Sequence, residues 1–142
     1  YQVGDAACFT PEKAGWRYHI GIIRSLHENR SGDKVATVRW MLRPEDDHLM
    51  LEALKRTPSL KEVALSDVED TVPVESVERH VLVEHVPAKV LDDVLTSEHS
   101  AFLLLLAATP DVYAYAYAWE KGHLRDVTAG EAARLQNLAP AS

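Results

Sequence analysis

Cysteine is almost absent from this chain: Cys8 is the only one among 142 residues. A single cysteine excludes an internal disulfide, fits a reducing compartment and leaves no cysteine pair for a zinc site. None of the seven histidines forms a HExxH motif, and no GxSxG, Walker-type or GxGxxG segment is present. We therefore expect no metal, no cofactor, no catalytic residues and no enzymatic activity.

Long apolar runs and a basic charge balance are also missing. The longest apolar run, residues 101–108, is far short of the roughly eighteen residues that span a bilayer, so it predicts a buried helix. The formal net charge of −7 disfavours a general nucleic-acid binder and suits a basic partner. Acidic residues gather at 45–47 and 67–70, where solvated loops are the alternative interpretation.

Alternating apolar and polar residues predict short strands along most of the chain. Residues 18–28 and 34–42 flank the turn cluster 29–33 and predict an antiparallel hairpin. Further strands are expected at 1–9, 62–66, 70–74, 80–86, 112–119 and 124–127. The predicted fold class is mainly β, a small curled barrel or sheet of short strands.

Helical patterns are concentrated in the C-terminal third. We expect short helices at 88–95, at 98–108 with Ser97 as its N-cap, and at 128–138, and one helical turn at 49–55. Residues 1–142 are expected to form one domain, with a core at 1–127 and a C-terminal helix or tail at 128–142. Because the chain begins with Tyr1 rather than methionine, we expect it to be excised from a longer protein.

Aromatic residues alternate with alanines near the C-terminal end, which predicts one strand face carrying Tyr113, Tyr115, Tyr117 and Trp119. Such a row can stack bases or bind a peptide. The alternative, which we favour, is a core row covered by the helix at 98–108. Alanine is a poor strand former, so its use here indicates close packing on the opposite face as well.

Tyr18 and Trp40 lie on the two strands of the predicted hairpin, which can bring them to the same end of the sheet. Two aromatic faces are the minimum for holding a quaternary ammonium, at about 0.5–2 kcal/mol per cation–π contact. Nearby carboxylates would add charge attraction. The alternative is that Trp40 fills the barrel and Tyr18 caps it.

Several segments, in order, resemble the bromo-adjacent homology (BAH) domain family over residues 1–127. Tyr18-x-Ile-Gly-x-Ile resembles one of its core strands, and Arg39-Trp40-x-x-Arg43-Pro44-Glu45-Asp46 resembles its W-F/Y-Y/F-R-P-E-D/E segment. Three later pieces also match: Glu62-Val-x-Leu-Ser66, Val72-Pro-Val-Glu-Ser-Val77 and the closing aromatic strand at 113–127. Each piece is short, and the ordered set carries the resemblance.

The resemblance implies a nuclear, chromatin-associated β module, some of whose members bind histone tails and read methylated lysine through an aromatic cage. Tyr18 and Trp40 match two cage positions, but the third is Leu42, and Val68 stands where some readers have a histidine. Trp16, His48 or a C-terminal tyrosine would have to supply the missing wall. The candidate peptide-binding residues are Tyr18, Trp40, Leu42, Glu45, Asp46 and Asp70.

Two functions remain open from the sequence. The first is a non-enzymatic module that binds a basic histone tail, with or without methyl-lysine readout through an incomplete cage. The second is a structural scaffold that binds another subunit of its own chromatin complex through the C-terminal helices. Nucleic acid is disfavoured as the main partner, and no membrane association is expected.

Overall fold

The computed structural model describes residues 1–11, 17–96 and 101–136, with the side chains of residues 102 and 103 left aside. Its main feature is a seven-stranded sheet in the order β5-β1-β2-β3-β4-β8-β9. The strands are β1 (Ala6–Phe9), β2 (His19–Glu28), β3 (Lys34–Leu42), β4 (Ala64–Pro73), β5 (Val77–His80), β8 (Tyr117–Glu120) and β9 (His123–Asp126). Among the described strand pairs of this sheet, β4 and β8 are parallel and the others are antiparallel. The mainly β fold class predicted from the sequence is confirmed.

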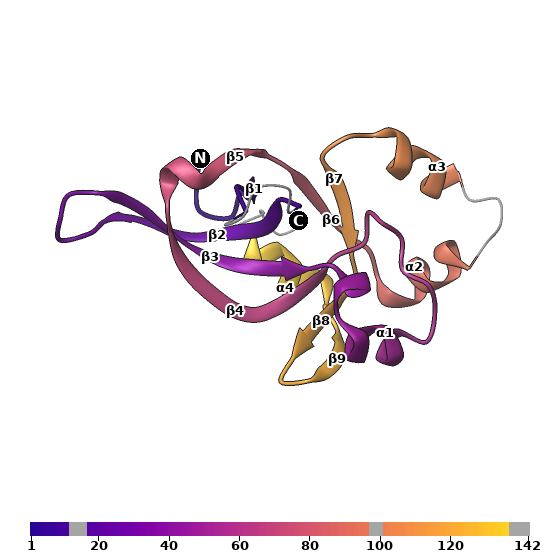
Figure 1. The fold of residues 1–142 in the computed structure, drawn as a ribbon. Coiled ribbons are helices and arrows are strands. Elements are labelled where there is room, and N and C mark those ends of the chain that lie inside the picture. The colour runs from indigo at the N-terminus through magenta and orange to yellow at the C-terminus, as the bar shows by residue number, and fades with distance from the viewer. Residues whose placement is uncertain (12–16, 97–100, 137–142) are drawn as a thin grey trace.

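A small parallel sheet of β6 (Leu82–His85) and β7 (Val112–Tyr115) links β5, at one edge of the large sheet, to β8, beside the other edge strand. β6 follows β5 after Val81, and β7 runs into β8 after Ala116. Figure 1 shows the resulting curled, barrel-like body, with the β2–β3 hairpin projecting from one end. An isolated bridge between Glu62 and Ala114 also joins the β4 side to β7. Curling reduces the exposed sheet edge that a flat sheet would leave open.

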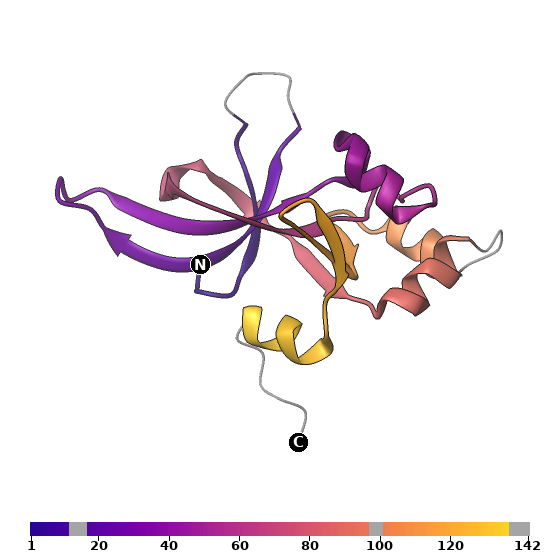
Figure 2. The same cartoon turned by 90° about the horizontal axis from the view of Figure 1, so that it is seen from below.

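In the described part of the chain, four α-helices lie outside the sheet: α1 (His48–Leu54), α2 (Ala88–Leu95), α3 (Ala101–Ala108) and α4 (Ala129–Leu135). The first three gather at the end opposite the hairpin tip, whereas α4 lies apart from them (Figure 2). Short 3-10 turns, η1 (Pro44–Asp46) and η2 (Val74–Ser76), bend the chain after β3 and β4. The predicted cap Ser97 lies outside the described residues. Among those described, no helix has the length and apolar character needed to cross a membrane.

Four predicted strands are corrected by the structure. The expected strands 62–66 and 70–74 merge into one strand, β4, because Glu69 between them pairs with Arg39 of β3 and a register shift accommodates the residues before it. The expected strand 80–86 is interrupted at Val81, which separates β5 from β6. The expected strand 112–119 breaks at Ala116 into β7 and β8, which belong to different sheets.

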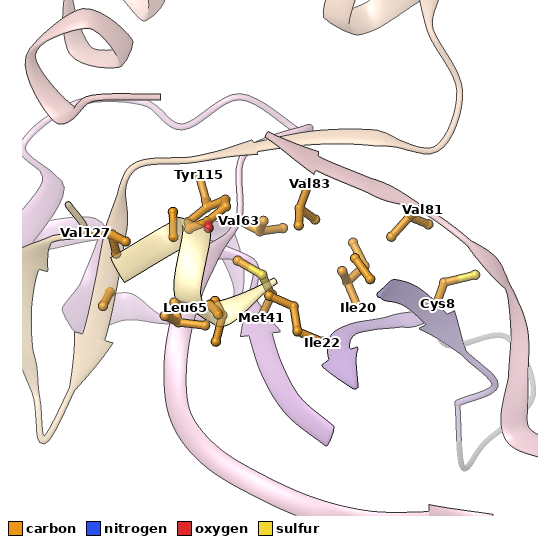
Figure 3. Packing of buried hydrophobic residues seen from close by; sticks show 14 residues of the cluster. Cys8, Ile20, Ile22, Met41, Val63, Leu65, Val81, Val83, Tyr115 and Val127 are labelled. Atoms are coloured by element: carbon orange, nitrogen blue, oxygen red, sulfur yellow. The ribbon is translucent and has the colours of Figure 1, made fainter. Parts of the chain in front are cut away.

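The break at Ala116 also changes the alternation: before it aromatic side chains face the main core, and after it an alanine does. Tyr115 packs with Ile20, Leu65 and Val83 in the main core, which Figure 3 shows. After the break, Ala118 joins that core while Tyr117 packs with Leu91 and Leu106 of the helices. The four aromatics therefore do not share one face. The predicted close packing of alanines is confirmed, since Ala114 and Ala116 are fully buried against the helical cluster.

A buried ion network attaches the helical end to the sheet. Arg56 donates two hydrogen bonds of 2.8 Å to the two carboxylate oxygens of Glu62, and its Nε donates to Asp92 of α2 at 2.8 Å. The other oxygen of Asp92 accepts from the Tyr117 hydroxyl at 2.5 Å. Hydrogen bonds and nearby carboxylates outweigh burial and raise the pKa of Arg56. The residues joined by this network are far apart in the sequence, so it fixes the tertiary arrangement of α2.

Candidate functional site

A pocket of about 560 Å³ opens where β2 begins and β3 ends. The start of β2 and the end of β3 are paired, with Ile20 opposite Met41, so the residues flanking both strands meet here. Its lining residues are Arg17, Tyr18, His19, Ile20, Met41, Leu42, Arg43, Asp46 and Asp47. Three of the predicted site residues, Tyr18, Leu42 and Asp46, are thereby brought together. We call this the Tyr18 pocket.

Tyr18 supplies the aromatic surface of this pocket. Its side chain is 42% exposed. One cation already lies over the ring, because the Arg79 guanidinium carbon is 5.3 Å from its centroid. Arg43 fixes the backbone beside it by donating from Nη2 to the Tyr18 carbonyl at 3.1 Å. The ring is thus held in place and retains exposed surface.

The acidic side of the pocket is paired with Arg17. This guanidinium donates to Glu45 at 2.9 Å and to Asp46 at 2.5 Å. The hydrogen bond to Glu45, followed by the charge of Asp46, raises the pKa of Arg17. Glu45 does not line the pocket, and its Oε2 is buried with no hydrogen-bond partner among the described residues. Asp46 remains well exposed and lines the pocket.

Asp47 is a lining residue that the predicted site did not include. Its Oδ1 accepts from the backbone N–H groups of Leu49 and Met50 at 3.0 and 3.1 Å, so it caps the N-terminus of α1. The signal was present in the sequence, because an aspartate directly before a helical apolar pattern is a typical N-cap. Its second carboxylate oxygen has no hydrogen-bond partner among the described residues.

Trp40 lies outside the Tyr18 pocket, on the other face of the sheet. Trp40 pairs with Gly21 and shares its face of the sheet. Tyr18 comes two residues before Ile20, which pairs with Met41, and alternation along the strand assigns it to the opposite face. The indole makes an edge contact with Phe9 at 5.2 Å between centroids and belongs to a second core cluster. A methyl group on Gly21 would sit 3.0 Å from the indole, so the glycine permits this close packing. Within the described part of the chain, no ring contact joins Tyr18 to Trp40.

Asp70 lies beside Trp40 rather than beside Tyr18. The Trp40 Nε1 donates to Asp70 Oδ2 at 2.7 Å. This contact follows from the sheet register, because Asp70 pairs with Val38, two residues before Trp40 and on the same face. A register shift in β4 opposite Trp40 leaves Val68 half exposed nearby. The predicted site residues therefore separate into two groups on opposite faces.

His19 links the two groups and was not among the predicted residues. Its ring lies 5.7 Å from Trp40, and it also lines the Tyr18 pocket. The sequence signal that could have identified His19 was its position between Tyr18 and Ile20 in the predicted strand. Of the residues considered for a third cage wall, His48 pairs with Glu52 on α1 and does not line the pocket. Trp16 lies outside the described residues.

Comparisons with known proteins agree with the arrangement of strands. A crystal structure of the BAH domain of yeast Rsc2 superposes with a TM-score of 0.62 at 15% sequence identity, over 92% of this chain. This chain spans about half, 51%, of that protein chain. No curated protein sequence matches. The family profile described as the BAH domain matches residues 1–127. The chain therefore belongs to the BAH domain family, whose members are non-enzymatic interaction modules of chromatin-associated proteins.

Proposed function

We propose that this domain binds a basic peptide, such as a histone tail, in the Tyr18 pocket, and that it acts in the nucleus. The observation that carries the proposal is the pocket itself, in which an exposed aromatic ring lies close to Asp46 and Asp47. A lysine or arginine side chain has an apolar stem and a charged head, and both parts have complementary surfaces here. The net charge of −7 would steer such a peptide toward the domain.

Arg17 occupies the position that we assign to a peptide cation. Its ion pairs with Glu45 and Asp46 lie at the surface, with the Arg17 side chain 51% exposed. Exposed ion pairs contribute only about 0–1 kcal/mol, so an incoming cation can replace Arg17 at small cost. One side of the pocket is therefore held by a weak internal contact of the same chemistry as the proposed ligand.

Methyl-lysine readout through this pocket should have low selectivity. Tyr18 supplies one aromatic wall, Leu42 supplies none, and Trp40 lies on the opposite face. Exposed cation–π contacts are worth about 0.5–1 kcal/mol, so one wall favours a methylated lysine by a few-fold. We propose that the domain binds basic peptides with less than about tenfold preference for methylation.

A modified-histone peptide array followed by fluorescence polarisation tests this proposal. Tyr18→Ala and Asp46→Asn should each weaken binding of the best peptide by about tenfold, because they remove the aromatic wall and a carboxylate. Glu28→Gln is the matched control, since it removes one exposed negative charge far along β2. Equal weakening in the control, or no binding of any basic peptide, would reject the pocket. A binding preference above tenfold for one methylation state of lysine would contradict the proposed low selectivity.

A scaffold role remains a second candidate because of α3. This helix is apolar on all sides, yet Leu104 is 74% and Leu105 67% exposed. Such helices are normally covered on every side, so these leucines fit a surface that docks against another subunit. In the full-length protein, Leu104→Ser with Leu105→Ser should prevent incorporation into its native complex, measured by size-exclusion chromatography. Under this function Tyr18→Ala would leave incorporation unchanged.

A further inference from the structure

Three cations from separate segments meet at two tyrosine rings. The Lys61 Nζ lies 4.6 Å from the centroid of Tyr113, and the Arg43 guanidinium carbon lies 5.6 Å from the same ring. Arg79 lies over Tyr18, whose carbonyl accepts from Arg43. We call Arg43, Lys61, Arg79, Tyr18 and Tyr113 the basic cluster. A concentration of positive charge is unexpected on a chain of net charge −7.

The basic cluster has more positive than negative charge. Among the described residues, Asp111 is the carboxylate that forms an ion pair with a cation of the cluster, at 2.9 Å from Arg79 Nε. Within the described residues, Arg43 and Lys61 have no carboxylate at ion-pair distance, and they donate instead to the carbonyls of Tyr18 and Thr109, each at 3.1 Å. Counted over the groups at ion-pair distance, three cations and one anion leave an excess of about two positive charges. Guanidinium N–H groups of Arg43 and Arg79 remain available for a further acceptor.

Burial is the main effect that opposes the charge of Lys61, and the positive charge of Arg43 adds to it. Burial lowers the pKa of Lys61, the charge of Asp111 opposes the shift, and the charge of Arg43 has a smaller lowering effect. At Arg79 the hydrogen bond to Asp111 raises the pKa. An anion placed among the three cations would stabilise the charged form of Lys61 and relieve its repulsion with Arg43. The cluster therefore has the charge and the donors of an anion site.

We propose that the basic cluster binds a phosphate monoester carried by a peptide. A phosphorylated side chain brings a charge of about −1.5 to −2 and three strong acceptor oxygens, which matches an excess of about two charges better than a carboxylate does. A nucleic-acid backbone would need a longer basic stripe, and the chain's net charge of −7 opposes it. This site does not depend on the Tyr18 pocket accepting a cation, although the two share Tyr18 and Arg43.

NMR titration of the nitrogen-15-labelled domain with inorganic phosphate, and then with N-acetyl-phosphoserine amide, tests the site. Both ligands should shift the backbone resonances of Arg43, Lys61, Arg79 and Tyr113. Lys61→Gln and Arg79→Gln should each weaken binding about tenfold, because each removes a charge-assisted donor. Arg30→Gln is the matched control, since it removes one exposed cation in the β2–β3 turn and should leave affinity unchanged.

Two outcomes would overturn the proposal. One is the absence of resonance shifts in the basic cluster, or a weakening of phosphate binding in Arg30→Gln equal to that in Lys61→Gln. The latter result would show that binding depends only on the overall charge of the domain. The other is tighter binding of a single-stranded oligonucleotide than of phosphoserine amide at equal phosphate concentration, with a steep salt dependence, which would identify nucleic acid as the partner. Arg79 is exposed, so Arg79→Gln keeps the test valid if Lys61→Gln is unstable. Asp46→Asn separates this site from the Tyr18 pocket, because it should weaken a basic peptide and leave phosphate binding intact.

Discussion

The indole nitrogen of Trp40 donates a 2.7 Å hydrogen bond to the carboxylate of Asp70. These residues were predicted to belong to one peptide-binding surface with Tyr18. The bond instead holds the indole over Gly21 and against Phe9, on the sheet face opposite the Ile20 side chain. In this structure Trp40 therefore closes a core cluster, and the neighbouring pocket keeps Tyr18 as its aromatic wall.

Trp40→Ala should destabilise the fold by about 2–3 kcal/mol. This loss is smaller than that expected for truncating a fully buried tryptophan, because the Trp40 ring is only half buried. Trp40→Phe keeps a ring against Phe9 and loses the N–H, so it should cost about 1 kcal/mol. Urea unfolding followed by circular dichroism measures both. Wild-type stability in Trp40→Ala together with complete loss of basic-peptide binding would assign Trp40 to the binding surface instead.

Arg56→Met should lower the free energy of unfolding by about 3–5 kcal/mol, because it leaves the buried carboxylate of Glu62 without its cation. The double variant Arg56→Met with Glu62→Leu should recover most of that loss, since neither buried charge remains. A double-mutant cycle in urea gives the coupling energy. Arg17→Met, which breaks an exposed pair, serves as the control and should cost less than about 1 kcal/mol. Similar losses at positions 17 and 56 would contradict a buried network.

Tyr115→Phe should leave stability unchanged or increase it by up to about 1 kcal/mol. The Tyr115 side chain is fully buried, and its hydroxyl has no hydrogen-bond partner among the described residues. Burial raises the pKa of this phenol to about 12. Thermal unfolding by calorimetry measures the effect. Tyr117→Phe should instead lower the stability, because the Tyr117 hydroxyl donates a hydrogen bond to Asp92. A marked loss of stability in Tyr115→Phe would show that the hydroxyl has a partner in solution.

Glu131 should make stability depend on pH below about 4.5. Two hydrogen bonds from Arg125 hold its pKa below the ordinary value of 4.5. A lowered pKa in the folded state stabilises the protein above pH 4.5, and this contribution is lost as the pH falls through the folded value. Glu131→Gln should therefore be less stable than the wild type at pH 7, with a smaller difference at pH 3. A constant difference across this range, measured by urea unfolding, would be the contrary result. Glu28→Gln controls for net charge.

The local patterns of the sequence were sufficient for the β2–β3 hairpin and for α2, whose predicted bounds, 88–95, match the structure. They failed where long-range pairing decides the outcome. Residues 67–69 have the composition of a turn, yet they continue β4, where Glu69 pairs with Arg39 of β3 and a register shift accommodates the residues before it. The alternation at 113–119 indicated one face, but the chain changes sheets at Ala116, which a residue pattern cannot encode.

The same division holds for the candidate site. The sequence by itself determined the family, the acidic balance and the positions of Tyr18, Leu42 and Asp46, because short motifs and charge are local properties. Tertiary structure alone decided that Trp40 faces away from Tyr18, since one step of sheet register sends neighbouring side chains to opposite faces. It also decided that Arg43, Lys61 and Arg79 share two tyrosine rings. These cations are distant along the chain, and only the curled sheet and its connections bring them together.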